Sequence, residues 1–412
     1  MSDAGTRLAT DPAPLRAWVD ELGAIGADAA GGTTRVAWSP ALRAALDWLA
    51  ATCARLGLAV HEDAAGNLFA RWGPDGDDAV LVGSHADTVP QGGRFDGALG
   101  VLAGLEAVRL LRDAGYEPRR AIVVAAWMDE EGTRFKTPTL GSRAFAGHDL
   151  SALAGATDAD GVTLADAMAS WGRDVARLPE AQGVDGIAAC LELHIEQGPV
   201  LEEAGVELGL VTQIAGLLGL RATFTGTAAH AGATPMGRRR DALSAAARAI
   251  VALEDWAAGR EDVPVTVGIV EVLPGGFNVI PGECRFTIDV RAQSEQALDA
   301  AEQAVRAALA DAAAHGGVEH AVQRTHRLAP VPLDPELTAV LARGAAREGA
   351  TTLALASGAG HDAMQLAPLV PTAMLFVPSD GGLSHNPAEH TSPAACHLGA
   401  RVLAHALREL TS

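Results

Sequence analysis

Apolar residues recur along this chain at two different spacings, and these spacings predict where helices and strands form. Between residues 14 and 56, leucines recur every three or four positions, which indicates amphipathic helices. Residues 58–72 predict a β-hairpin around a polar turn. Short apolar runs typical of buried strands occupy residues 79–82, 121–128, 187–195 and 373–378. Because helical patterns separate these runs, we expect an α/β domain in which helices cover a mixed sheet.

A different pattern begins after residue 211. Strands are expected at residues 220–226, 265–273 and 284–291, and helices at residues 241–256 and 296–313. This order is typical of a compact, ferredoxin-like α+β unit. We therefore expect a main domain made of residues 1–212 and 328–412, interrupted by an inserted unit of residues 213–327. An insertion of this size favours a lid that closes over a cleft.

Composition and charge narrow the class of protein. A chain of 412 residues is long enough for two domains, and its net charge of −20 argues against nucleic acid or an anionic membrane as a partner. No apolar run approaches the roughly 18 residues of a membrane-spanning helix, and the polar first residues show no signal-peptide pattern. The four cysteines are widely spaced, which indicates reduced thiols in a cytoplasmic protein.

Histidines and acidic residues gather where the apolar runs end. The candidate metal ligands at these ends are His85, Asp87, Asp96, Glu130, Glu131 and His194. The first three lie in a glycine-rich stretch, and its glycines are expected to let the backbone fold tightly around an ion. Loops at the carboxyl ends of strands in one sheet come together, so these side chains are expected to meet. Imidazole and carboxylate groups suit divalent cations such as zinc or manganese.

Further candidates follow from the same residues. If both glutamates line the site, one is expected to bind metal and the other to transfer protons, with a pKa raised by burial. His385 lies in a loop stiffened by Pro387, as a fixed ligand would, and His361 is expected behind a ligand or facing a substrate. No role is expected for the histidines placed on helices or polar loops: His315, His320, His326, His390, His397 and His405.

Seven motifs carry a family resemblance over nearly the whole chain. They are GSHADTVPQGGRFDGALGV, DEEGTRF, LELHIEQGPVLE, HAGATPMGRRRDAL, FNVIPGECRFTIDVR, SGAGHDAM and SHNPAEHT. In this order they resemble the amidase branch of the metal-dependent aminoacylase and carboxypeptidase superfamily. That branch includes N-carbamoyl-L-amino-acid hydrolases, allantoate amidohydrolases, ureidoglycolate amidohydrolases and β-ureidopropionases. The HIEQGPVLE and RRDAL segments favour it over the peptidases of the superfamily.

The resemblance implies a binuclear metal centre. The implied ligands are His85 and His194 for one divalent cation, Glu131 and His385 for the other, and Asp96 as the bridge. Asp87 would orient the His85 imidazole, and Glu130 would be the general base. The resemblance leaves the metal open among Zn²⁺, Mn²⁺, Co²⁺ and Ni²⁺.

The resemblance also implies substrate contacts and a homodimer formed through the lid. His230 would hydrogen-bond the developing oxyanion and, as in relatives, reach across the dimer interface. The other implied contacts are Gln197, Asn278, Arg291 and the backbone of Gly360, with Arg291 as a fork for a carboxylate. Residues 217–220 are Leu-Leu-Gly-Leu where relatives often carry a polar residue, so the contact made there in relatives is not expected here.

The expected function is hydrolysis of an N-carbamoyl-L-amino acid to the amino acid, CO₂ and ammonia. The substrate is thus a small molecule that bears a carboxylate and a carbamoyl or ureido group. The first alternative is an allantoate or ureidoglycolate amidohydrolase of purine breakdown. Less favoured alternatives are an aminoacylase and a non-catalytic binding protein with the same fold.

Overall fold

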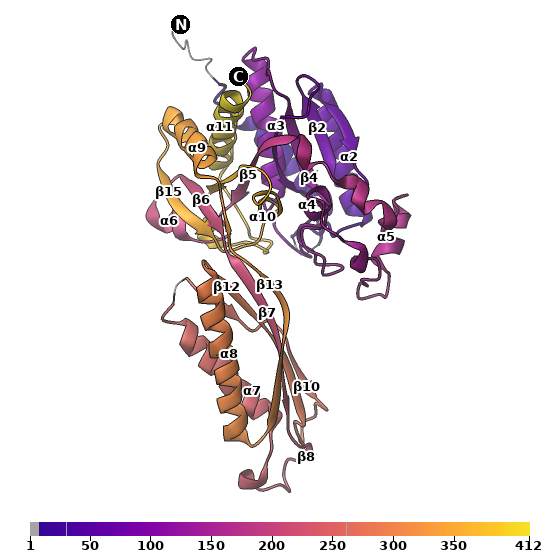
Figure 1. The fold of residues 1–412 in the computed structure, drawn as a ribbon, viewed down its shortest axis with the longest axis vertical. Coiled ribbons are helices and arrows are strands. Elements are labelled where there is room, and N and C mark those ends of the chain that lie inside the picture. Colours follow the sequence, from indigo (N-terminus) through magenta and orange to yellow (C-terminus); the bar gives the residue numbers. More distant parts are fainter. Residues whose placement is uncertain (1–7, 30, 261) are drawn as a thin grey trace. The chain divides into compact units, whose positions relative to one another are not determined.

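The computed structural model describes residues 8–29, 31–260 and 262–412 and divides the chain into two compact units (Figure 1). The first unit comprises residues 1–212 and 332–412, and the second comprises residues 213–331. None of the helices in the described ranges combines the length and apolar composition that crossing a membrane requires.

The first unit alternates strands and helices. Its strands are β1 (Ala59–Glu62), β2 (Leu68–Trp72), β3 (Ala79–His85), β4 (Ile122–Trp127), β5 (Ile187–Ile195), β6 (Leu208–Ile214), β14 (Val331–Pro332), β15 (Thr352–Ser357) and β16 (Thr372–Val377). Its α-helices are α1 (Ala13–Ala24), α2 (Pro40–Arg55), α3 (Ala98–Asp113), α4 (Leu140–Phe145), α5 (Leu164–Ser170), α6 (Val200–Ala204), α9 (Pro335–Glu348), α10 (Ala363–Leu366) and α11 (Pro393–Leu410). Short 3₁₀ turns lie at Ser151–Leu153, Val175–Ala181, Val184–Gly186 and Asp380–Gly382.

One mixed sheet organises this unit. Its nine strands follow the order β1-β2-β4-β3-β5-β16-β6-β14, and β15 pairs with β6. The central strands β4, β3, β5 and β16 are parallel, whereas β2 and β6 pair antiparallel to them. Four carboxyl-terminal strand ends therefore lie along one edge of the sheet. The predicted α/β class with a mixed sheet between helices is confirmed.

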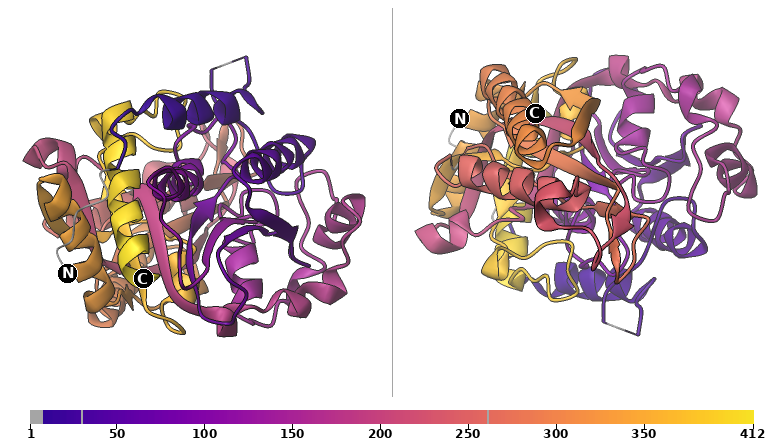
Figure 2. Two further views of the ribbon diagram at one scale, coloured as in Figure 1. Left: turned by 90° about the horizontal axis from the view of Figure 1, so that it is seen from above. Right: turned by 90° about the horizontal axis from the view of Figure 1, so that it is seen from below.

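Both faces of this sheet are covered. Val80 and Val82 of β3 pack in a large core with residues of α1, α3 and α11, whereas Ala79 and Leu81 pack in a smaller core with residues of α4 and α10. On the larger side α3 and α11 lie next to each other (Figure 2, purple and yellow). Because both faces of β3 are buried, its sequence is a continuous apolar run rather than an alternating one.

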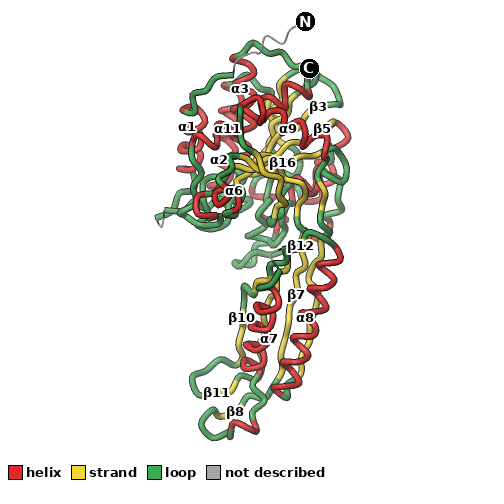
Figure 3. Tube along the Cα trace, turned by 90° about the vertical axis from the view of Figure 1, so that its left-hand side faces the viewer, coloured by secondary structure: helices red, strands yellow, loops and turns green. Residues whose placement is uncertain are grey.

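The second unit has its own antiparallel sheet and core. Its strands are β7 (Gly216–Thr225), β8 (Ala229–His230), β9 (Val265–Thr266), β10 (Val270–Leu273), β11 (Val279–Ile280), β12 (Glu283–Ala292) and β13 (Glu319–Leu328). The main sheet has the order β10-β12-β7-β13 with β9 beside β12, and β8 pairs with β11. Helices α7 (Ala242–Ala257) and α8 (Glu295–Gly316) pack against this sheet (Figure 3), and a 3₁₀ turn lies at Met236–Arg238.

Three details of the second pattern were predicted wrongly. The stretch 265–273 forms two short strands rather than one, and the break between them contains Gly268, a residue type that weakens strands. Strand β13 was not expected, and neither was β6, which leads from the first unit into the second. His320 and His326 lie on β13 rather than on a helix or loop. Most residues of β13 are exposed on both faces, so the strand lacks the apolar alternation that would reveal it.

Candidate metal centre

The site lies where the central strands of the first unit end. His85 is the last residue of β3, and His194 is the penultimate residue of β5, which runs parallel to β3. Strand β4 pairs with the other edge of β3 and leads directly into Glu130 and Glu131. The loop that joins β3 to α3 carries Asp96. The parallel sheet thus brings three segments that are distant in sequence to one edge.

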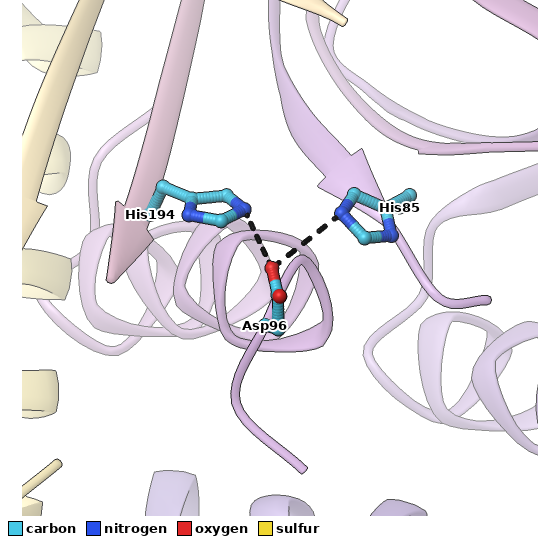
Figure 4. A group of neighbouring side chains, drawn as sticks. All are labelled: His85, Asp96 and His194. Atoms are coloured by element: carbon cyan, nitrogen blue, oxygen red, sulfur yellow. Dashed lines mark ion pairs between the residues drawn. The ribbon is translucent and has the colours of Figure 1, made fainter. Parts of the chain in front are cut away.

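Asp96 lies between two histidines from different strands. Its Oδ1 atom is 3.1 Å from Nε2 of His194 and 3.9 Å from Nε2 of His85. All three residues are buried, and the two imidazoles point toward the carboxylate (Figure 4). Their ligand atoms lie within 4.8 Å of one another, which is the spacing of a shared cation site.

The second oxygen of Asp96 belongs to another cluster. Its Oδ2 atom lies 3.2 Å from Nε2 of His385, and the same imidazole nitrogen lies 3.4 Å from Oε2 of Glu131. These three residues also have ligand atoms within 4.8 Å of one another. Each oxygen of Asp96 therefore faces a different set of metal-competent side chains.

Hydrogen bonds orient the two buried imidazoles. The Nδ1 atom of His194 lies 2.9 Å from the carbonyl oxygen of Ile195, and Nδ1 of His85 lies 3.1 Å from the carbonyl oxygen of Asp87. A carbonyl oxygen can only accept, so each Nδ1 carries a proton, and in the neutral imidazole the lone pair lies on Nε2. In His194 this lone pair accepts the backbone N–H of Gly97 at 3.2 Å. Both Nε2 atoms are thus prepared to act as ligands.

Asp87 connects the first histidine to the glutamates. Its two carboxylate oxygens accept the backbone N–H groups of Glu130 and Glu131, each at 3.2 Å. Its Oδ1 atom also lies 3.6 Å from Nδ1 of His85. Asp87 therefore stabilises the turn that carries both glutamates. It lies on the Nδ1 side of His85, away from the Nε2 ligand atom, as a carboxylate that supports a ligand does.

Glu130 lies beside the first cluster without joining it. Its Oε2 atom is 3.6 Å from Nε2 of His85, and its side chain is 11% exposed. Burial raises the pKa of this carboxyl well above its ordinary value, and nearby carboxylates such as Asp362 and Glu131 raise it further against the opposing effect of His85. A carboxyl with a raised pKa can accept and return a proton near neutral pH.

Proton binding competes with cation binding at the second cluster. Burial, followed by the Asp96 carboxylate, raises the pKa of Glu131 to about 7. The hydrogen bond to Asp96 raises the pKa of His385 to about 9. A cation must displace these protons when it binds.

The donor set fits two divalent cations. Ligand atoms arranged tetrahedrally around a cation at about 2.0–2.2 Å lie roughly 3.3–3.6 Å from one another. The separations of 3.1, 3.9, 3.2 and 3.4 Å in the two clusters bracket this range. The groups are imidazoles and carboxylates without thiolates, which suits Zn²⁺, Mn²⁺, Co²⁺ and Ni²⁺.

Comparison with known proteins places the chain in a family. Residues 81–409 match the model of peptidase family M20/M25/M40. The chain belongs to this family. It is similar to the N-carbamoyl-L-amino acid amidohydrolase of Geobacillus stearothermophilus, with 43% identity over 95% of this chain and 96% of that protein. It is also similar to the allantoate amidohydrolase of Bacillus subtilis, with 35% identity over 95% of this chain and 96% of that protein.

A solved structure supports the same assignment. The hydantoinase/carbamoylase family amidase from Burkholderia multivorans superposes with a TM-score of 0.87 at 38% identity, over 98% of each chain. The predicted membership in the amidase branch of this superfamily is confirmed. The protein is therefore a metal-dependent hydrolase of C–N bonds.

In this M20 amidohydrolase, the predicted substrate-binding residues are divided between the two units. In the first unit, Gln197 donates from Nε2 to Oδ2 of Asp96 at 3.1 Å, and Gly360 is half-buried. In the second unit, His230 is exposed, and its Nδ1 accepts the backbone N–H of Gly232 at 3.1 Å. Asn278 is exposed next to the short β11 strand. Arg291 lies on β12, with its Nε 2.8 Å from Oδ1 of Asp289.

From sequence, His361 was expected behind a ligand or facing a substrate, whereas Ser384 and Glu389 of this M20 site were given no role. His361 packs edge-on against His194 with ring centres 4.6 Å apart, and its Nε2 is 2.7 Å from the hydroxyl of Ser357. Ser384 and Glu389 are hydrogen-bonded to the Asp96 loop. Because these partners are far apart in the sequence, only the fold reveals the contact.

Proposed function

We propose that this chain is a binuclear amidohydrolase that cleaves a C–N bond of an N-carbamoyl-L-amino acid. The observation that carries the proposal is the Asp96 carboxylate, because its two oxygens face two separate groups of metal-competent side chains. The carbamoyl substrate is favoured by the 43% identity to an N-carbamoyl-L-amino acid amidohydrolase. Allantoate, favoured by the relative from Bacillus subtilis, is the second candidate.

Five residues would hold the two cations. His85 and His194 would bind one, Glu131 and His385 would bind the other, and Asp96 would bridge them. When bound, such a pair of cations supplies an electrophile for the carbonyl oxygen and lowers the pKa of a shared water towards ~7.

Glu130 would carry the proton through the reaction. Its carboxylate takes one proton from the attacking water as the water oxygen bonds to the carbamoyl carbon. It then returns this proton to the departing nitrogen as the C–N bond breaks, because an amide anion is a poor leaving group. The carbamate that remains decomposes to CO₂ and an amine. Burial of the Glu130 carboxyl supports this role, since it raises the pKa towards that of the proton donor.

Four side chains and one backbone group would bind the substrate. Gln197 has a buried Oε1 atom to which the described residues donate no hydrogen bond, and this oxygen would accept a substrate N–H. Arg291 and Asn278 would bind the substrate carboxylate, and His230 would donate to the oxyanion. The backbone of Gly360 would complete the set. Residues 213–327 would act as a lid and form the interface of a homodimer.

The cysteines support a cytoplasmic location for this hydrolase. All four are buried and unpaired, as expected in a reducing compartment.

An ammonia-release assay tests the proposal. Purified protein is assayed with N-carbamoyl-L-methionine, allantoate, ureidoglycolate and N-acetyl-L-methionine, each with and without added Mn²⁺ or Zn²⁺, and amino-acid release is followed for the acetyl compound. We expect metal-dependent turnover with the highest kcat/KM for the carbamoyl amino acid. A higher kcat/KM for allantoate or ureidoglycolate would indicate that the enzyme acts in purine breakdown. Absence of turnover with every carbamoyl and ureido substrate would refute the proposal.

A further inference from the structure

Glu389 lies in the loop between β16 and α11, four residues after His385. The residue is only 4% exposed, although its neighbours Asn386, Pro387 and Ala388 are exposed. Burying a carboxylate is costly unless hydrogen bonds compensate for the lost water. The partners of Glu389 therefore indicate what the buried carboxylate does.

One oxygen of Glu389 holds the backbone of the Asp96 loop. Its Oε1 atom accepts the backbone N–H groups of Phe95 at 2.9 Å and of Asp96 at 3.0 Å. The carboxylate approaches this loop so closely that a Cβ atom on Gly93 would lie 2.0 Å from Oε1. Hydrogen bonds to an ionised acceptor are roughly twice as strong as neutral ones. Two of them to consecutive amides fix the peptide that carries Asp96.

The other oxygen of Glu389 reaches the Asp96 side chain through Ser384. The Ser384 hydroxyl oxygen lies 3.0 Å from Oε2 of Glu389 and 2.9 Å from Oδ2 of Asp96. A hydroxyl has one proton, so it donates to one of these carboxylates at a time. Gln197 also donates to Oδ2 of Asp96, at 3.1 Å. This oxygen is the one that faces His385.

We propose that Glu389 is a positioning residue that sets the orientation of the Asp96 carboxylate, with one oxygen toward His85 and His194 and the other toward His385. The inference rests on the proposed binuclear function, in which Asp96 is the bridge. Glu389 itself is not a ligand in this scheme, because among the described residues it joins no group of mutually close ligand atoms. Without Glu389, Asp96 stays near both clusters but loses the orientation that bridging requires.

Titration of the metal-free protein with Mn²⁺ tests the inference independently of turnover. Two Mn²⁺ ions that share a carboxylate give an exchange-coupled EPR spectrum. In Glu389→Ala, we expect the second Mn²⁺ to bind 10–100-fold more weakly, the usual effect of losing a group that supports a ligand. We also expect the coupled spectrum to be replaced by that of isolated ions. Glu389→Gln keeps an oxygen that accepts both amides, so it should restore most of the coupled spectrum.

A second buried glutamate provides the control. Glu348 of α9 is paired with Arg401 and His405, and its side chain is 5% exposed. Glu348→Gln should lower the melting temperature but leave the Mn²⁺ affinity and spectrum unchanged. If Glu389→Ala does not fold, Glu389→Asp takes its place, because the shorter side chain cannot span the same two amides and Ser384.

The possible outcomes separate this inference from the proposed function. Wild-type affinity for the second ion and a wild-type spectrum in Glu389→Ala, or in Glu389→Asp, would overturn the positioning role. A wild-type protein that never shows a coupled pair would overturn it as well. A wild-type protein that shows the coupled pair but hydrolyses no carbamoyl or ureido substrate would refute the proposed function alone.

Discussion

Replacing Glu130 by glutamine tests whether this residue moves protons or binds metal. Its carboxylate lies 3.6 Å from Nε2 of His85, yet it belongs to neither cluster of ligand atoms around Asp96 in the described part of the chain. Glutamine has the same shape and keeps one acceptor oxygen, but it cannot take a proton from water. The backbone N–H of residue 130 still donates to Asp87. The substitution therefore removes proton transfer and little else.

The expected loss follows from that role. General acid–base catalysis contributes about 10²–10⁴-fold to a rate, so kcat of Glu130→Gln should fall by this factor, or about 2.7–5.4 kcal/mol of transition-state stabilisation. The number of bound Mn²⁺ ions should stay at the wild-type value. Glu131→Gln is the matched control, because Glu131 is the next residue and lies in the second cluster. It should lose one Mn²⁺, with affinity reduced at least ~100-fold.

The assay combines ammonia release with metal analysis by mass spectrometry on the same protein preparations. Loss of one metal ion from Glu130→Gln would refute the reasoning and make Glu130 a ligand. A kcat within tenfold of the wild type, with both ions bound, would exclude Glu130 as the general base. If Glu131→Gln kept both ions at wild-type affinity, the assignment of the second cluster would be wrong.

Three further predictions concern protons, substrate and metal removal. Cation binding should release protons, because the pKa is raised to about 9 in His385 and to about 7 in Glu131. The apparent Mn²⁺ affinity measured by calorimetry should therefore rise about tenfold per pH unit between pH 7 and 9. An affinity that does not change with pH would contradict this prediction. Arg291→Ala should raise KM for carboxylate-bearing substrates at least tenfold. Arg285 is an exposed arginine on the same face of β12, and Arg285→Ala should leave KM unchanged. A wild-type KM in Arg291→Ala would exclude Arg291 as the residue that binds the substrate carboxylate. Removing metal with EDTA should lower the melting temperature measured by calorimetry by several degrees. A cation present at 100 times its Kd stabilises the folded state by ~2.7 kcal/mol. An unchanged melting temperature would mean that no cation binds the folded protein.

The main sheet could be predicted because its central strands are buried on both faces. Strand β5 coincides with the expected run 187–195, and β4 differs from its expected run by one residue at each end. Continuous apolar runs of this length are typical of parallel strands covered by helices. Strand β13 could not be predicted, because most of its side chains are exposed and it forms only by pairing with β7. Such pairing between distant segments leaves little trace in local sequence.

The types of residues at the site could be predicted, but their connections could not. His85, His194 and Glu131 follow or end apolar runs, so their convergence follows from the geometry of a parallel sheet. The position of Asp96, with one oxygen toward each cluster, depends on the path of a loop. The local sequence pattern does not reveal this path. The contact between Glu389 and Asp96 joins residues 293 positions apart.

For a glycine beside Asp96, the structure gives a physical reason that differs from the expected one. The sequence suggested that the glycines around Asp96 let the backbone fold around an ion. In the structure, Gly97 has a φ of +63°, and a Cβ atom placed there would lie 2.3 Å from the imidazole of His85. Glycine is thus needed because a ligand side chain occupies the space beside the backbone. The absence of a side chain at residue 97 allows the imidazole of His85 to approach the Asp96 carboxylate.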